Sequence, residues 1–174
     1  MDADQFAARL RDLAPPLDHL QEQGFTVAEA IGIRRGFECI LRTEVSGPVH
    51  RDPIVDLLSR YDATGLEIGL IAFASHVEDR GNKLYFGEAE SDYLVIDKAT
   101  GRVQVLDHAK PDHVICECAE TSERFFDALI AGLDVASLGD RSLGQCVNLA
   151  GGQRYRAFYA DILGWGLDAD EGDQ

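Results

Sequence analysis

The stretch that decides the fold is FGEAESDYLVIDKATGRVQVLDH, residues 86–108. Within it, residues 93–96 are apolar on both alternating faces, which is typical of a strand in the interior of a sheet. Residues 97–101, DKATG, supply the polar residues and the glycine of a turn. The apolar run then resumes over residues 103–106. This order predicts a β-hairpin at the centre of a sheet.

Neighbouring apolar segments place the hairpin in a larger sheet. Residues 68–73 and 84–86 are apolar and too short to predict helices, so we expect both to join one mainly antiparallel sheet of about four to six strands. Thr121 can cap a following helix, whose apolar stripe faces the sheet. That stripe contains Phe125, Phe126, Leu129, Ile130 and Leu133. The sequence therefore predicts an α+β fold.

Short helices are predicted before the sheet by apolar residues at helical spacing. The proline pair at 15–16 interrupts the first pattern, so two short pieces are expected in place of one rod. Thr26 and Glu29 have the spacing of a capping box, which opens another helix. Asp52, just before a proline, opens the next helix. Residues 37–45 are interpreted as a strand.

Two further apolar stripes follow the sheet, over residues 143–150 and 155–163, and the glycine pair at 151–152 separates them. A chain of 174 residues is long enough for one well-buried core, whereas a second core would be cramped. We expect a single α+β domain over residues 1–167, in which helices cover a central, mainly antiparallel sheet. An acidic, frayed tail is expected over residues 168–174.

Acidity is the main compositional feature of the chain. Lys and Arg number 16 against 31 Asp and Glu, which gives a formal net charge of −15. Such a charge repels nucleic-acid phosphates and anionic lipids, and it can steer the chain to a basic protein. The sequence has no N-terminal targeting pattern and no apolar run of membrane-span length, so a cytoplasmic location is expected.

The cysteines lack the dense spacing of a secreted disulfide scaffold, and reduced, mostly buried thiols are expected. They are Cys39, Cys116, Cys118 and Cys146. The strongest metal candidate combines His113 with Cys116 and Cys118, because imidazole and sulfur suit zinc. Only one C-x-C occurs, however, and the apolar neighbours favour an ordinary strand with small buried side chains.

Catalytic signatures are absent from the sequence. A cysteine nucleophile needs a nearby histidine, and the histidines available to one are His50, His76, His108 and His113. No serine lies in a G-x-S-x-G elbow, and no glycine pattern fits a nucleotide-phosphate loop, so no cofactor is expected. Asp107 and His108 are interpreted as a turn pair, and Arg154 and Arg156 as part of an amphipathic helix face.

An acidic cluster is the feature most readily assigned to function. Glu88, Glu90 and Asp92 alternate along the chain, so an extended segment would place three carboxylates on one face, with Glu78 and Asp79 upstream. Such a row is often a solvated strand entrance. It also suits a basic protein partner, because complementary charge raises the association rate and specificity. These five residues are our predicted partner-binding set.

The pattern of the central stretch resembles the SUKH superfamily, known mainly as bacterial immunity proteins against polymorphic toxins. The matching motifs are an FGE opening, then YLVID, TG and VQVLDH, and later the helix start TSERFFDAL. The resemblance covers about residues 66–134. It implies a compact α+β domain with helices packed on an antiparallel sheet. The chain departs from the family pattern in lacking an N-terminal tryptophan-containing helix and in extending beyond Gly139.

The resemblance also implies a function without catalysis. Such proteins bind a toxin domain, commonly a nuclease or nucleic-acid deaminase, and block its active site; an acidic inhibitor can occupy a basic groove as a phosphate mimic. Two alternatives stay open. A regulatory or scaffold adaptor would bind several host proteins more weakly, and a zinc- or cysteine-dependent enzyme would hold stoichiometric zinc or a reactive thiol.

Overall fold

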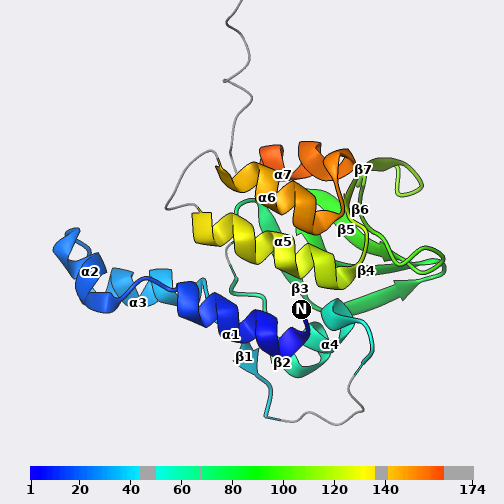
Figure 1. Cartoon of the computed structure of the whole chain (residues 1–174). Coiled ribbons are helices and arrows are strands. Elements are labelled where there is room, and N and C mark those ends of the chain that lie inside the picture. Colours follow the sequence, from blue (N-terminus) through cyan, green and yellow to red (C-terminus); the bar gives the residue numbers. More distant parts are fainter. Residues whose placement is uncertain (44–49, 67, 136–140, 163–174) are drawn as a thin grey trace, which may run out of the picture.

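The structure, a computed structural model, describes residues 1–43, 50–66, 68–135 and 141–162 (Figure 1). The helices are α1 (Ala3–Leu13), α2 (Leu17–Glu22), α3 (Val27–Arg35), α4 (Pro53–Arg60), α5 (Ser122–Val135), α6 (Arg141–Ala150) and α7 (Arg156–Ile162), with a 3-10 turn, η1 (Gln153–Tyr155), before α7. The strands are β1 (Ile40–Leu41), β2 (Tyr61–Asp62), β3 (Ile71–Arg80), β4 (Lys83–Ala89), β5 (Asp92–Asp97), β6 (Val103–Leu106) and β7 (Val114–Ala119). None of the described helices has the length and apolar character needed to span a membrane.

The main sheet is a five-stranded antiparallel meander in which β3 to β7 follow one another in space as in sequence. The short strands β1 and β2 form a separate antiparallel pair. The predicted α+β fold and antiparallel sheet are confirmed. The predicted hairpin is β5 and β6, where Leu94 lies opposite Val105 and Ile96 opposite Val103.

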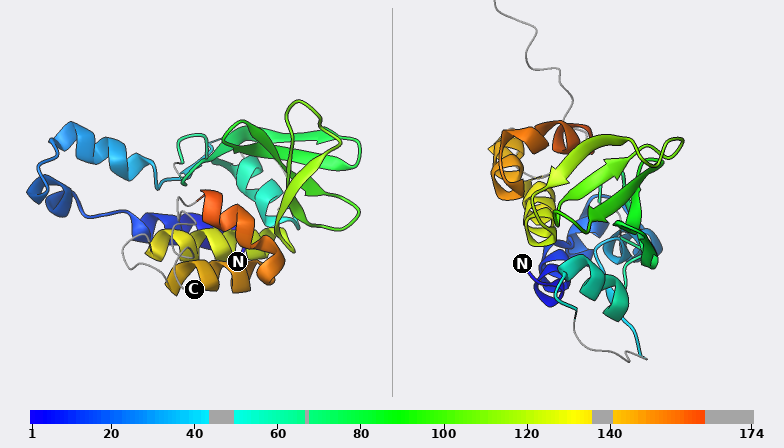
Figure 2. Two further views of the ribbon diagram at one scale, coloured as in Figure 1. Left: turned by 90° about the horizontal axis from the view of Figure 1, so that it is seen from above. Right: turned by 90° about the vertical axis from the view of Figure 1, so that its right-hand side faces the viewer.

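One face of the sheet forms the main core with the helices. On β5, Leu94 and Ile96 point to this side and are buried with Phe86 of β4. Helix α5 supplies Phe125 and Phe126, both fully buried, as the predicted apolar stripe requires. Figure 2 shows helices α1, α4, α5, α6 and α7 gathered on this side of the sheet. Strand alternation leaves the intervening residues on the opposite, outer face.

The loop between β5 and β6 has the turn chemistry that the sequence indicates. The Asp97 carboxylate accepts hydrogen bonds from the backbone N–H groups of Ala99 (2.8 Å) and Thr100 (3.1 Å), and Gly101 has a φ of +74°. On the outer face, the Lys83 ammonium lies 2.6 Å from Asp97 and 2.7 Å from the Gln104 side-chain oxygen. The Lys83 ammonium is the main reason that the pKa of Asp97 is below its usual value.

Irregular pairing around Gly87 makes the middle of β4 distinctive. Phe73 of β3 lies opposite Gly87, and Glu78 lies opposite Tyr85, so β3 contains several extra residues between these pairs. A Cβ at position 87 would lie 2.4 Å from the Ala72 carbonyl oxygen. The FGE step therefore combines a buried phenylalanine with a glycine that lets the β3 backbone approach closely.

Several helix boundaries agree with the sequence. The proline pair separates α1 from α2, and the capping box of Thr26 and Glu29 opens α3. The Asp52 carboxylate accepts hydrogen bonds from two backbone N–H groups at the start of α4 and one from the Ser122 hydroxyl at the start of α5. This single side chain thus ties the first turns of two helices together.

Two predicted strands need correction. The strand expected over residues 37–45 is reduced to the two residues of β1. The chain leaves α3 through a turn, and β1 then pairs with the two residues of β2. Residues 44 and 45 lie outside the described part. The strand expected from residue 68 begins instead at Ile71, after a turn that contains Gly69 with a φ of +56°. The predicted tail also lies outside the described residues.

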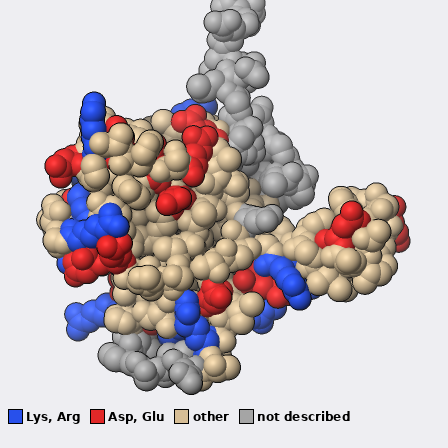
Figure 3. All heavy atoms as spheres, turned by 180° about the vertical axis from the view of Figure 1, so that it is seen from behind, with Lys and Arg blue, Asp and Glu red and all other residues tan. Residues whose placement is uncertain are grey.

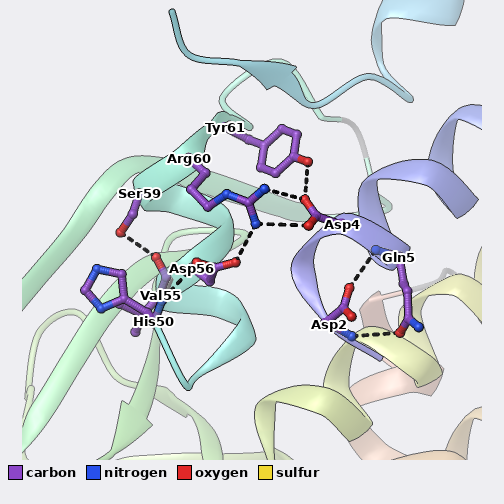
Figure 4. Close-up of polar contacts among 9 residues, drawn as sticks. All are labelled: Asp2, Asp4, Gln5, His50, Val55, Asp56, Ser59, Arg60 and Tyr61. Atoms are coloured by element: carbon purple, nitrogen blue, oxygen red, sulfur yellow. Dashed lines mark hydrogen bonds and ion pairs between the residues drawn. The ribbon is translucent and has the colours of Figure 1, made fainter. Parts of the chain in front are cut away.

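A polar cluster fastens α1 to the end of α4 (Figure 4). The Arg60 guanidinium lies 2.7 Å from the Asp4 carboxylate and 2.9 Å from that of Asp56, which is buried. The Tyr61 hydroxyl donates a 2.5 Å hydrogen bond to Asp4, and this bond is the main reason that the pKa of Asp4 is lowered. The His50 backbone N–H donates to Asp56. Arg60 is therefore the shared partner of two carboxylates.

Candidate partner-binding surface

The predicted acidic row does not form as a single extended segment. Glu90 and Ser91 are the two turn residues between β4 and β5, and Ala89 pairs directly with Asp92. Glu90 has a φ of 60°, a left-handed conformation that a two-residue hairpin turn requires at its first position. The predicted alternation of these carboxylates along one strand is wrong, because the turn at Glu90 and Ser91 interrupts the strand. Glu88 and Asp92 therefore lie on different strands.

The turn also sends these carboxylates to different sides of the sheet. Glu88 is exposed on the outer face, opposite Tyr93 in register. Asp92 pairs with Ala89, a core residue, and so belongs to the helix-facing side. Glu90 and Asp92 line a hollow of about 220 Å³ that also includes Asp161 of α7. The five predicted residues consequently do not share one surface.

The other two acidic residues, Glu78 and Asp79, lie near the C-terminal end of β3, and both are paired with cations. Glu78 lies 2.6 Å from the Arg80 guanidinium, which lowers the pKa of the Glu78 carboxyl. Asp79 lies 2.5 Å from the Lys98 ammonium. Figure 3 shows positive and negative side chains side by side on the face that it presents. Among the described residues, no ion pair involves Glu88 or Glu90.

An aromatic and arginine cluster lies on the outer face of the sheet. The rings of Tyr85 and Tyr93 meet edge to face with centroids 5.3 Å apart, and both side chains are half-buried. The Arg80 guanidinium lies 4.4 Å from the Tyr85 ring centroid and 5.7 Å from that of Tyr93. With Glu78 and Glu88 they line a hollow of about 350 Å³. We call Glu78, Arg80, Tyr85, Glu88 and Tyr93 the tyrosine face.

The chemistry of the tyrosine face suits recognition of another protein. Tyrosine and arginine are enriched among residues that contribute most to protein–protein binding, because each combines a broad contact area with hydrogen-bonding groups. Here, stacking on Tyr85 and the ion pair to Glu78 hold Arg80 in place. Less side-chain entropy is lost when a partner binds a surface that is already ordered.

Sequence reasoning found the acidic part of this surface and missed the rest. The sequence predicts that Tyr93 lies in a strand, and its alternation with Asp97 marks the side turned away from the core. Arg80 and Tyr85 meet next to the two-residue turn at Gly81 and Asn82, where Arg80 pairs with Lys83 and Glu78 with Tyr85. A Gly-Asn pair between two strands is a hairpin signal that could have indicated this pairing.

Asp92 has a local partner in His108. The Asp92 carboxylate accepts a hydrogen bond from the His108 backbone N–H at 3.0 Å and lies 2.9 Å from the ring Nδ1. The Asp107 carboxylate accepts from two backbone N–H groups of its own loop, as expected of a turn residue. Ligand atoms of these three residues lie within 4.8 Å of one another. Their contacts with one another and with the loop account for the cluster.

We expect this pair to make stability depend on pH near neutrality. The hydrogen bond that the His108 ring donates to the Asp92 carboxylate raises the pKa of His108 above its usual 6.5, so the protonated form is favoured in the folded state. The contribution is complete below pH 6.5 and is lost as pH rises through the raised pKa. Urea unfolding of wild type and His108→Gln across this range measures it. A stability difference that stays constant with pH would contradict the assignment.

The zinc candidate is not assembled in the described part of the chain. His113 is exposed in the β6–β7 loop, Cys118 is fully buried, and the one group with metal-ligand spacing among the described residues contains neither. Burial raises the pKa of the Cys39 thiol to about 12 and that of Cys146 to about 11. Half-buried Cys116 has a lowered pKa, because it forms a hydrogen bond with Cys118.

The basic segment before α7 is also occupied within the chain. Arg154 forms an ion pair with Glu117 of β7, and its guanidinium lies 5.0 Å from the Tyr155 ring centroid. Arg102 shares the same carboxylate at 3.2 Å. These contacts join η1 to the edge of the sheet, in keeping with the interpretation of Arg154 as part of an amphipathic structural element.

Comparison with known proteins gives no relative: no protein-family model, no curated protein and no solved structure matches this chain.

Proposed function

We propose that this chain is a non-catalytic immunity protein of the SUKH type, acting in the cytoplasm. It binds one basic toxin domain, a nuclease or nucleic-acid deaminase, and blocks its active site. The observation that carries this proposal is the tyrosine face, a hollowed, half-buried aromatic surface on the side of the sheet away from the core helices. Its chemistry favours a protein partner, because flat aromatic rings and a held arginine provide broad contact area.

Charge supports a basic partner in particular. The chain carries a formal net charge of −15, which accelerates the approach of a positively charged domain and lowers affinity for nucleic acid. On the tyrosine face, Glu88 is exposed and has no ion-pair partner among the described residues, so its carboxylate is available to a cation of the toxin. Glu78 would contribute less, because Arg80 already neutralises it.

The site offers a physical route to inhibition. A toxin that acts on nucleic acid needs a positively charged groove to hold phosphates. A convex part of that toxin can bury Tyr85 and Tyr93 while Glu88 occupies a phosphate position in the groove. Phosphates and the inhibitor would then compete for the same cations, and no reaction on the inhibitor is required.

Affinity capture from the source organism with the full chain as bait, followed by mass spectrometry, tests this proposal. We expect one basic toxin domain at 1:1 stoichiometry, whose nuclease or deaminase activity falls as the purified chain is added. Recovery of several host proteins, with no effect on any of their activities, would instead support the adaptor. Stoichiometric zinc in the purified chain, or turnover of a substrate, would contradict a non-catalytic role.

A further inference from the structure

Four of the nine exposed large apolar side chains in the described part of the chain lie in one projecting segment. Helices α2 and α3 extend away from the rest of the chain as a helical hairpin, residues 15–36, which we call the arm (Figures 1 and 2). Four large apolar side chains on the arm are 40–55% exposed. They are Leu17, Phe25, Val27 and Ile31.

The arm has too little internal packing to account for its own order. Apart from Gly36 at its base, its buried residues are Leu20 and Ala30, and neither of these two belongs to the main core. The Arg34 side chain ties the arm together at its base with a 2.7 Å hydrogen bond to the Pro15 carbonyl. Helices of six and nine residues are marginal in water unless other structure packs against them. The exposed apolar residues mark where such packing is missing.

One face of α3 carries the pattern expected of a helix–helix contact. Val27, Ile31 and Arg35 recur every four residues and therefore lie along one side of the helix. Gly32 beside them has open space around it, so a second helix can approach closely at this point. The face is apolar at the outer end and in the middle, and basic where the arm meets the body.

The distribution of charge along the arm identifies the partner. Acidic residues lie at the outer end, as Asp18 and Glu22 of α2, whereas Arg34 and Arg35 lie at the base. The arm as a whole has three carboxylates and two arginines, so it is nearly neutral in a chain of net charge −15. A basic partner would gain little there, and a second acidic copy would meet the least repulsion there.

We propose that the arm is a self-association surface, on which the arms of two copies pack side by side in opposite directions about a two-fold axis. In this arrangement, Ile31 lies next to Ile31 of the second copy, and Arg35 lies near Glu22 of the second copy. The acidic outer end of each arm therefore lies next to the arginine-containing end of the other arm, where that arm joins the body. The interface is separate from the tyrosine face, so a dimer leaves both toxin-binding surfaces free.

Sedimentation equilibrium of the full chain over a range of concentrations tests the proposal. We expect the wild type to dimerise reversibly and Ile31→Glu to weaken dimerisation by about a hundredfold, because two carboxylates would face each other at the axis. Ile115→Glu is the matched control, since Ile115 is similarly exposed (49% against 41%) but lies on β7. A monomeric wild type, or equal weakening by both variants, would overturn the proposal.

A charge exchange tests the antiparallel arrangement without changing the apolar residues. Glu22→Arg and Arg35→Glu should each weaken dimerisation by about tenfold, because each places like charges together. The double variant Glu22→Arg/Arg35→Glu should restore it, since every copy then carries both exchanged charges. A double variant that is no better than the single variants would overturn the arrangement. Circular dichroism confirms that each variant keeps its helices.

Discussion

Gly87→Ala is expected to destabilise the fold by about 3 kcal/mol, as overpacking at a tight backbone contact does. The new Cβ would lie 2.4 Å from the Ala72 carbonyl oxygen, and the atoms that must move belong to the backbone of β3. The strand pair would have to open at the point where Phe73 faces Gly87. Urea unfolding of wild type and variant measures the change.

Gly144→Ala is the matched control for this substitution. Gly144 lies inside α6, and a Cβ there meets no heavy atom within 4 Å. Alanine is the better helix former, so this variant should be slightly more stable than the wild type, by about 0.5–1 kcal/mol. If Gly87→Ala were as stable as Gly144→Ala, the close approach of β3 to β4 would be wrong.

Arg60→Met should cost about 2 kcal/mol, because it leaves the Asp56 carboxylate buried without its cation. Asp56 is only 4% exposed, and the one hydrogen bond left to its carboxylate among the described residues comes from the His50 backbone N–H at 3.0 Å. The substitution also removes the cation shared with Asp4, although that carboxylate reaches solvent and contributes less. Thermal and urea unfolding both report the loss.

Arg80→Met provides the comparison, since it makes the same chemical change in an exposed pair. Both Arg80 and Glu78 are about half exposed, so this variant should stay within roughly 0.5 kcal/mol of the wild type. Equal losses from Arg60→Met and Arg80→Met would show that the Asp4–Arg60–Asp56 cluster does not fasten α1 to α4.

Much of the fold follows from local patterns in the sequence. The DKATG turn, the capping box at Thr26 and the aspartate before Pro53 each act within a few residues, and the structure has all three as expected. The wide apolar stripe of α5 likewise determines which side of that helix faces the core. The two-residue strand β1 shows the opposite case, because its length is set by a partner distant in sequence.

The site was harder to predict because it depends on pairing between strands. The acidic row required residues 88–92 to be extended, and a two-residue turn at Glu90 separates its members instead. Asp92 meets His108 through the pairing of β5 with β6. Arg80 reaches Tyr85 because the turn at Gly81 and Asn82 pairs Arg80 with Lys83 and Glu78 with Tyr85. The Gly-Asn turn has a sequence signal, whereas the meeting of Asp92 with His108 has none in a single sequence.

The most direct test of a partner-binding tyrosine face is calorimetric titration of the captured toxin domain with matched variants. We expect Tyr93→Ala and Glu88→Lys to weaken binding by about a hundredfold each, as residues at the centre of an interface do. Glu90→Lys makes the same charge change two residues away, on the other side of the sheet, and should bind like the wild type apart from a modest loss in association rate. Wild-type affinity in Tyr93→Ala, or equal losses from Glu88→Lys and Glu90→Lys, would contradict this assignment.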